Sequence, residues 1–108
     1  MIKHVEFDGE NHPFLINIAG MELVMDELDI NPFKVLQEGY GTPKNLHVLV
    51  YSGFRGGYLA SGKECPFDYN DVGLKLTLAD ITVFSKVISG QLMKEKSNGQ
   101  PVKKKQKA

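Results

Sequence analysis

The chain has 108 residues, of which 42% are hydrophobic and 24% are charged, the composition of one ordinary globular domain. No apolar run approaches the roughly 18 residues that a transmembrane helix needs, and the N-terminal segment lacks the long apolar region of a signal peptide. The single cysteine, Cys65, excludes an internal disulfide and predicts a reducing, cytoplasmic setting.

The net charge of zero hides an uneven distribution. Residues 1–93 contain 7 basic and 12 acidic side chains, a net charge of −5, whereas residues 94–108 contain 6 lysines and one glutamate, a net charge of +5. From about Lys96 onward there is almost nothing apolar to bury. We therefore expect a folded domain over residues 1–95, followed by a disordered basic tail over residues 96–108.

Two short runs near the N-terminus alternate apolar with polar residues and predict strands, at residues 5–7 and 14–18. The segment Asp8–Asn11 between them is rich in turn-forming residues. A four-residue loop over this segment would place Val5 opposite Phe14. The sequence therefore predicts an N-terminal β-hairpin.

After Gly20 the apolar spacing changes from that of a strand to that of a helix, with a stripe at Met21, Val24, Met25 and Leu28. The acidic residues on the other side of this helix are Glu22, Asp26, Glu27 and Asp29. We interpret them as a solvated face rather than a carboxylate site. Asn31-Pro32 ends this helix or begins the next turn, and a short helical patch follows around Phe33.

Thr42-Pro43 is typical of a helix start and predicts a second long helix from Lys44 to at least Arg55. One apolar stripe of this helix comprises Leu46, Leu49, Val50, Gly53 and Phe54. Gly56-Gly57 is expected either to end the helix or to fall within its last turn.

Two further helix starts carry capping signals. Asp68 and Asp71 have the spacing of a capping box, which predicts a short helix from Tyr69. Thr77 and Asp80 repeat that spacing and predict a last helix from near Leu78, with an inner face at Ile81, Phe84, Ile88 and Leu92. The predicted fold is α+β and mostly helical, with an N-terminal β-hairpin followed by about four helices and a disordered C-terminal tail.

Catalytic chemistry finds no support in the sequence. The three histidines, His4, His12 and His47, have no metal-type ligands at a standard spacing. Cys65 has no base or activating motif beside it. The glycines of residues 53–57 fall inside or after a helix, whereas a phosphate cradle precedes one. We expect no catalytic residues, no metal and no cofactor.

A second stripe on the helix from Lys44 is the candidate partner-binding surface. Val48, Tyr51 and Arg55 point away from the first stripe, and Tyr58 joins them if the helix continues through the glycines. Tyrosine and arginine are enriched at protein interfaces. The hypothesis is that these four residues line a surface for another chain; the alternative is that Tyr51 packs beneath the hairpin or the 60–66 loop.

The order of elements resembles the tail assembly chaperones of long-tailed bacteriophages and of related gene transfer agents. The resemblance covers residues 5–92 and rests on the hairpin turn (Val5–Gly9), the second strand (Pro13–Ile18), the acidic-apolar helix (Met21–Leu28) and the helix after the proline start (Leu46–Phe54), followed by the aspartate-capped pair from Phe67.

This resemblance implies a non-enzymatic protein that binds the tape measure protein, a long helical chain, in the host cell cytoplasm and is absent from the mature virion. The partner of the candidate surface would then be the tape measure protein or a second copy of the chain. One alternative is a small nucleic-acid-binding or regulatory protein that uses the Lys103–Lys107 tail. Another is a structural component of the virion, such as a head–tail connector.

Overall fold

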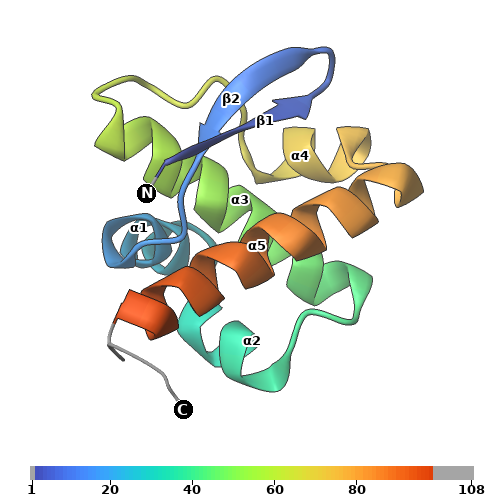
Figure 1. The fold of residues 1–108 in the computed structure, drawn as a ribbon. Helices are drawn as coiled ribbons and strands as arrows, with labels where there is room; N and C mark the ends of the chain where they lie inside the picture. Colours follow the sequence, from blue (N-terminus) through green and yellow to red (C-terminus); the bar gives the residue numbers. More distant parts are fainter. Residues whose placement is uncertain (1, 99–108) are drawn as a thin grey trace.

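The computed structural model describes the backbone of residues 2–98 and the side chains of residues 2–93. The elements are β1 (Lys3–Phe7), β2 (Glu10–Phe14), α1 (Ile18–Leu28), α2 (Pro32–Glu38), α3 (Pro43–Ala60), α4 (Tyr69–Lys75) and α5 (Leu78–Asn98). This arrangement confirms the predicted class, a mostly helical α+β fold with an N-terminal hairpin (Figure 1). Helix α5 continues past the boundary predicted at residue 96, and the rest of the predicted tail lies outside the described residues.

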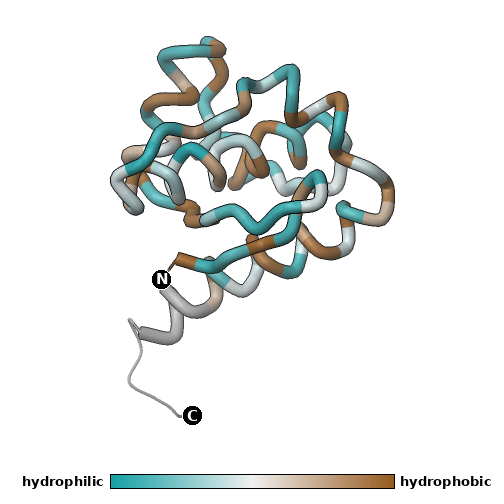
Figure 2. Tube along the Cα trace, turned by 90° about the horizontal axis from the view of Figure 1, so that it is seen from above, coloured by the Kyte–Doolittle hydropathy of each residue, from teal (hydrophilic) through white to brown (hydrophobic). Residues whose placement is uncertain are grey.

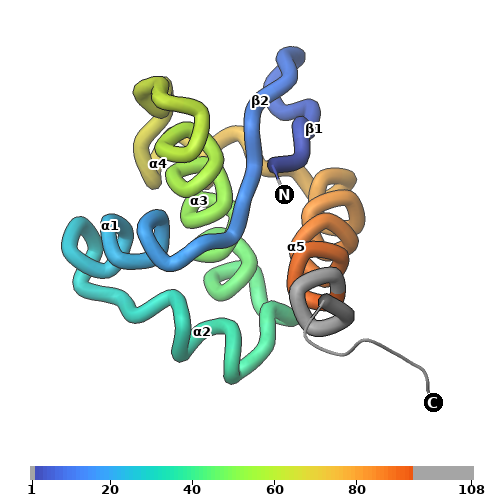
Figure 3. The backbone as a smooth tube through the Cα atoms, turned by 60° about the vertical axis from the view of Figure 1, so that its left-hand side comes forward, coloured from blue at the N-terminus to red at the C-terminus, as the bar shows by residue number. Residues whose placement is uncertain are grey.

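Helix α3 is the centre of the fold. It packs against α1, α2, α4, α5 and β2, and the other elements surround it in Figures 1 and 3. Its predicted stripe is buried throughout, which confirms that prediction. Apolar and polar residues alternate along the surrounding segments (Figure 2), so each contributes one apolar side to the common core. On α5, Phe84 and Ile88 are fully buried and Ile81 and Leu92 pack against the core, as predicted.

The hairpin closes more tightly than predicted. Asp8 and Gly9 both have positive φ, 54° and 84°, and form a two-residue turn between strands that pair Val5 with His12 and Lys3 with Phe14. The predicted four-residue loop, with Val5 opposite Phe14, is therefore wrong. An Asp-Gly pair with two positive φ angles matches the twist of the flanking strands, which favours the two-residue loop.

The second strand also ends earlier than predicted, at Phe14 rather than Ile18. The backbone N–H of Leu15 donates to the carbonyl of Gly53 on α3 over 2.9 Å, which takes the chain away from β1. Asn17 then caps α1, since its side chain accepts a hydrogen bond from the N–H of Gly20 over 2.8 Å. Of the predicted α1 stripe, Met25 is 43% exposed and so lies outside the core.

The later helix starts agree with their predicted caps. Thr42 accepts from the N–H of Asn45 at the start of α3. Asp68 and Asp71 form the reciprocal capping box at the start of α4, with distances of 2.8 and 3.0 Å. These contacts are local in sequence, which is why the spacing of the residues was sufficient to predict them.

Gly56 and Gly57 lie inside α3, where the end of β2 and the chain that follows it pass directly over them. A Cβ atom on Gly56 would lie 2.3 Å from the Leu15 carbonyl oxygen, and one on Gly57 would lie 2.3 Å from the Pro13 carbonyl oxygen. A Cβ atom on a third glycine, Gly53, would lie 2.1 Å from the nearest atom of the Phe14 ring. The hairpin can therefore reach α3 only because this face has no side chains.

Gly57→Ala should destabilise the fold by about 1–3 kcal/mol, because the new methyl group meets backbone that cannot rotate away. Gly90→Ala is the matched control, since a Cβ at this position of α5 has no atom within 4 Å. The control should be neutral or stabilising by up to about 1 kcal/mol, from helix propensity alone. Urea denaturation of both variants measures the difference, and equal effects would contradict the close contact.

Asp68→Ala should cost about 1 kcal/mol of unfolding free energy, because it leaves the N–H of Asp71 without its side-chain acceptor. Asp68→Asn retains an acceptor and should cost less. The same denaturation measurement tests both variants, and a neutral Asp68→Ala would show that the cap contributes nothing to stability.

A candidate partner-binding groove beside α3

The four predicted surface residues divide into two groups. Val48 and Tyr51 are 1% and 0% exposed, so the prediction that they line a surface of the folded chain is wrong. Helices α1 and α4 both pack against α3, and the Tyr51 ring lies edge-on to Tyr69 of α4 at 5.7 Å. Helix α3 is therefore buried on two sides. Arg55 and Tyr58, one and two turns further along, remain partly exposed.

Tyr51 and Arg55 share the carboxylate of Glu27, which α1 supplies. The Tyr51 hydroxyl donates to Glu27 at 2.9 Å and accepts from the Arg55 guanidinium at 2.7 Å, and Arg55 also forms an ion pair with Glu27. Burial raises the pKa of Tyr51 to about 12. The Glu27–Tyr51–Arg55 network thus keeps a neutral phenol in place and holds the guanidinium in one position at the protein surface.

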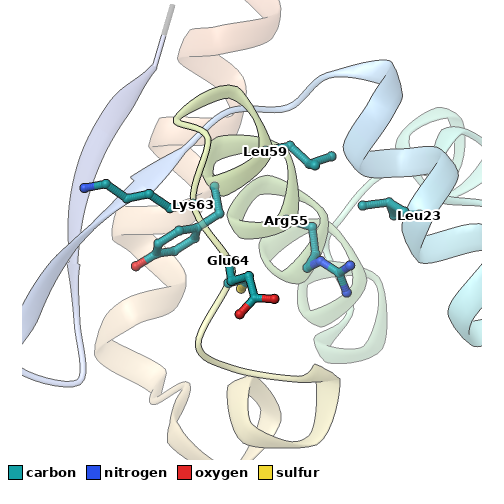
Figure 4. Close-up of a pocket in the computed structure, with 7 residues that line it drawn as sticks. Leu23, Arg55, Leu59, Lys63 and Glu64 are labelled. Atoms are coloured by element: carbon teal, nitrogen blue, oxygen red, sulfur yellow. The ribbon is translucent and has the colours of Figure 1, made fainter.

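A groove of about 380 Å³ opens beside this network. It is lined by Leu23, Arg55, Tyr58, Leu59, Lys63, Glu64 and Cys65. Figure 4 shows Arg55 and Leu59 on α3 on the side toward Leu23 of α1, whereas the end of Lys63 points away from them. Leu59 is 47% exposed. The groove therefore combines accessible apolar side chains with charged groups of both signs.

Tyr58 is fixed in the groove by a contact with the hairpin. Its hydroxyl lies 2.6 Å from Nδ1 of His12, a residue that is only 5% exposed. The His12 ring lies among aromatic neighbours, with Phe67 at 4.8 Å and Phe54 at 5.8 Å between ring centroids. One wall of the groove is therefore held by side chains from β2 and the core.

The groove contains no arrangement suited to nucleophilic catalysis. Cys65 is half-buried, its thiol lies 3.5 Å from the Phe67 carbonyl oxygen, and burial raises its pKa. The thiol is thus kept in its protonated, unreactive form at neutral pH. Among the residues that the structure describes, no group of three or more histidine, cysteine, aspartate or glutamate side chains could hold a metal ion.

The periodicity of the sequence indicated Arg55 and Tyr58 as surface residues but did not indicate Leu23, Leu59 or the role of Glu27. Tyr51 and Arg55 stand four residues apart on one helix, and this spacing indicates that they are neighbours. No comparable pattern connects them to Glu27, which is 28 residues away from Arg55 along the chain. The groove depends on how α1 packs against α3 and could not be predicted from the spacing of residues.

Comparison with known proteins assigns no family to this chain: no family description matches it, and neither a curated protein nor a solved structure is significantly similar. None of the helices described is both long and apolar enough to cross a membrane.

Tyr51→Phe should remove a pH dependence of stability in the alkaline range. Between pH 10 and about 12, Tyr51 retains its proton in the folded chain but would lose it in the unfolded chain. The folded state then binds more protons, so its stability falls as the pH rises through this window.

The measurement is the free energy of unfolding of wild type and Tyr51→Phe, from neutral pH to pH 12. Tyr40→Phe is the matched control. It removes a partly buried hydroxyl that is hydrogen-bonded to Ser89, and it leaves Glu27 and Arg55 unchanged. The wild type and the control should lose stability more steeply than Tyr51→Phe. Parallel curves for all three proteins would contradict the assignment.

Proposed function

We propose that this protein is a non-enzymatic tail assembly chaperone of a long-tailed bacteriophage. In this proposal it binds the tape measure protein in the host cytoplasm before the tail tube forms, and it is absent from the mature virion. The order of its elements resembles that family. The observation that carries the proposal is the open groove beside the second half of α3, which suits a protein segment rather than a reaction.

The chemistry of the groove favours a helical partner. A helix that binds in a groove presents apolar residues at intervals of three and four positions, with polar residues along both sides. Leu23 and Leu59 offer apolar contact, while Arg55 and Glu64 offer charges of opposite sign at the rim. A tape measure protein is a long helical chain, so it provides many segments of this kind.

Arg55 is the residue that we expect to contribute most to binding. Arginine is enriched among the few interface residues that dominate affinity. Glu27 and Tyr51 already hold its guanidinium, so little side-chain freedom remains to be lost on binding. Its remaining N–H groups are available to a partner's backbone or carboxylate.

Charge makes the folded part of the chain a poor nucleic-acid-binding surface. Residues 1–93 have a net charge of −5, and affinity for nucleic acid comes mainly from basic residues on phosphates. Residues 99–108 of the basic tail lie outside the described residues. Nucleic-acid binding that falls steeply with salt and vanishes on deletion of residues 96–108 would favour that alternative function, and incorporation into purified particles would favour a structural component.

Leu59→Asp should weaken binding to the tape measure protein by at least about tenfold while leaving the fold intact, because it places a charge in the apolar groove. Leu74→Asp is the matched control, since Leu74 is 85% exposed on α4 and does not line the groove. Arg55→Ala should weaken binding as well.

The assay is co-purification of each variant with a co-expressed tape measure protein, followed by titration of the purified pair. Unfolding by urea checks that the variants remain folded. Wild-type protein that fails to bind, or equal binding by wild type and Leu59→Asp, would contradict the proposal.

A further inference from the structure

The outer edge of β1 has no strand beside it within residues 2–98. The sheet consists of β1 and β2 alone, and β2 packs against α3, so β1 provides the open edge (Figure 1). A groove of about 430 Å³ runs along this edge, with Val83 and Val87 of α5 on its other side. Unpaired edges are templates for pairing with another strand.

Pro13 determines which backbone groups of β1 face outward. His4 is paired with Pro13, and proline has no N–H to donate, so this is a pair without mutual hydrogen bonds. The pattern alternates along an antiparallel ladder. Lys3, Val5 and Phe7 therefore bond to β2, whereas the N–H and C=O groups of His4 and Glu6 point to the open edge.

We propose that β1 pairs with β1 of a second copy of this chain, antiparallel and centred on Val5, to form a four-stranded sheet across a twofold axis. In this register His4 of each copy lies opposite Glu6 of the other, and these are the residues with outward backbone groups. An imidazole can donate a hydrogen bond to a carboxylate, and cross-strand pairs of this kind stabilise sheets.

Complementarity of His4 and Glu6 selects this register over its neighbours. Pairing centred on Glu6 would place two glutamates opposite each other, and like charges in direct opposition destabilise a sheet. Pairing centred on His4 would place two histidines opposite each other and leave the Glu6 carboxylates without an imidazole donor. His4 and Glu6 are both exposed in the single chain, so the pairing needs no rearrangement of the core.

The same arrangement accounts for an exposed valine on α5. Val83 is 48% exposed although it lines the groove beside β1. The twofold axis stands perpendicular to the joined sheet, so both hairpins keep their buried faces on one side. Each α5 then lies beneath the same sheet, and the second copy covers the groove that contains Val83.

The test is a charge exchange measured by analytical ultracentrifugation of the full chain. His4→Glu places glutamates opposite each other, and Glu6→Lys removes the carboxylate that accepts from His4, so each variant should weaken the dimer by about tenfold, because both symmetric pairs change. The double variant His4→Glu/Glu6→Lys places glutamate opposite lysine and should dimerise again. Mixing the two single variants should produce the heterodimer.

Glu22→Lys is the matched control, since it makes the same charge change at an exposed position of α1 and should leave dimerisation unchanged. A wild-type chain that stays monomeric across the concentration range would overturn the proposal. So would a dimer that the single variants leave intact, or one that only Leu59→Asp disrupts. Tape measure binding by the single variants should remain, so failure here is distinguishable from failure of the proposed function.

Discussion

The fold depends on the close approach of one backbone to another, where the end of β2 and the chain leading to α1 cross α3. Gly56 and Gly57 provide a surface without side chains, and the carbonyl oxygens of Leu15 and Pro13 occupy the space that Cβ atoms would fill. A polar backbone pressed against a helix must still find hydrogen-bond partners. Leu15 donates to Gly53 on α3, and from the other side Gln91 of α5 accepts from the N–H of Ile16 and donates to the carbonyl of Phe14. The crossing segment is therefore held between two helices.

This crossing positions both of the surfaces to which we assign binding. Because Phe14 is fixed over Gly53, the hairpin turns β2 toward α3 and leaves β1 at the outside. Because Asn17 both caps α1 and lies against Gly56, α1 begins beside α3 and brings Leu23 and Glu27 to Arg55. A side chain introduced at Gly56 or Gly57 would therefore change the shape of the groove, although no glycine lines it.

Features that depend on neighbours in sequence were predictable, whereas those that depend on the crossing were not. The caps at Thr42 and Asp68 and the buried stripe of α3 follow from spacing alone. The turn at Asp8-Gly9 could also have been predicted, since an Asp-Gly pair is a strong hairpin signal. The apolar alternation through Ile18 instead favoured a longer second strand. The burial of Tyr51 was one of the two alternatives that the sequence left open, but the elements that cover it, α1 and α4 rather than the hairpin or the 60–66 loop, could not be predicted from its periodicity. Helical periodicity identifies faces of a helix but not the elements that cover them.

The two proposed surfaces use different elements, so one does not occlude the other. The groove lies between α1, α3 and the 61–65 segment, and the open edge belongs to β1, with α5 beneath it. A dimer joined at β1 would carry two copies of the groove on one rigid assembly. For a long helical partner, binding at the second groove then becomes an intramolecular step, and the affinity of the pair can exceed that of either groove without any new contact. Two grooves of this size would in this way retain a long chain more tightly than either groove alone.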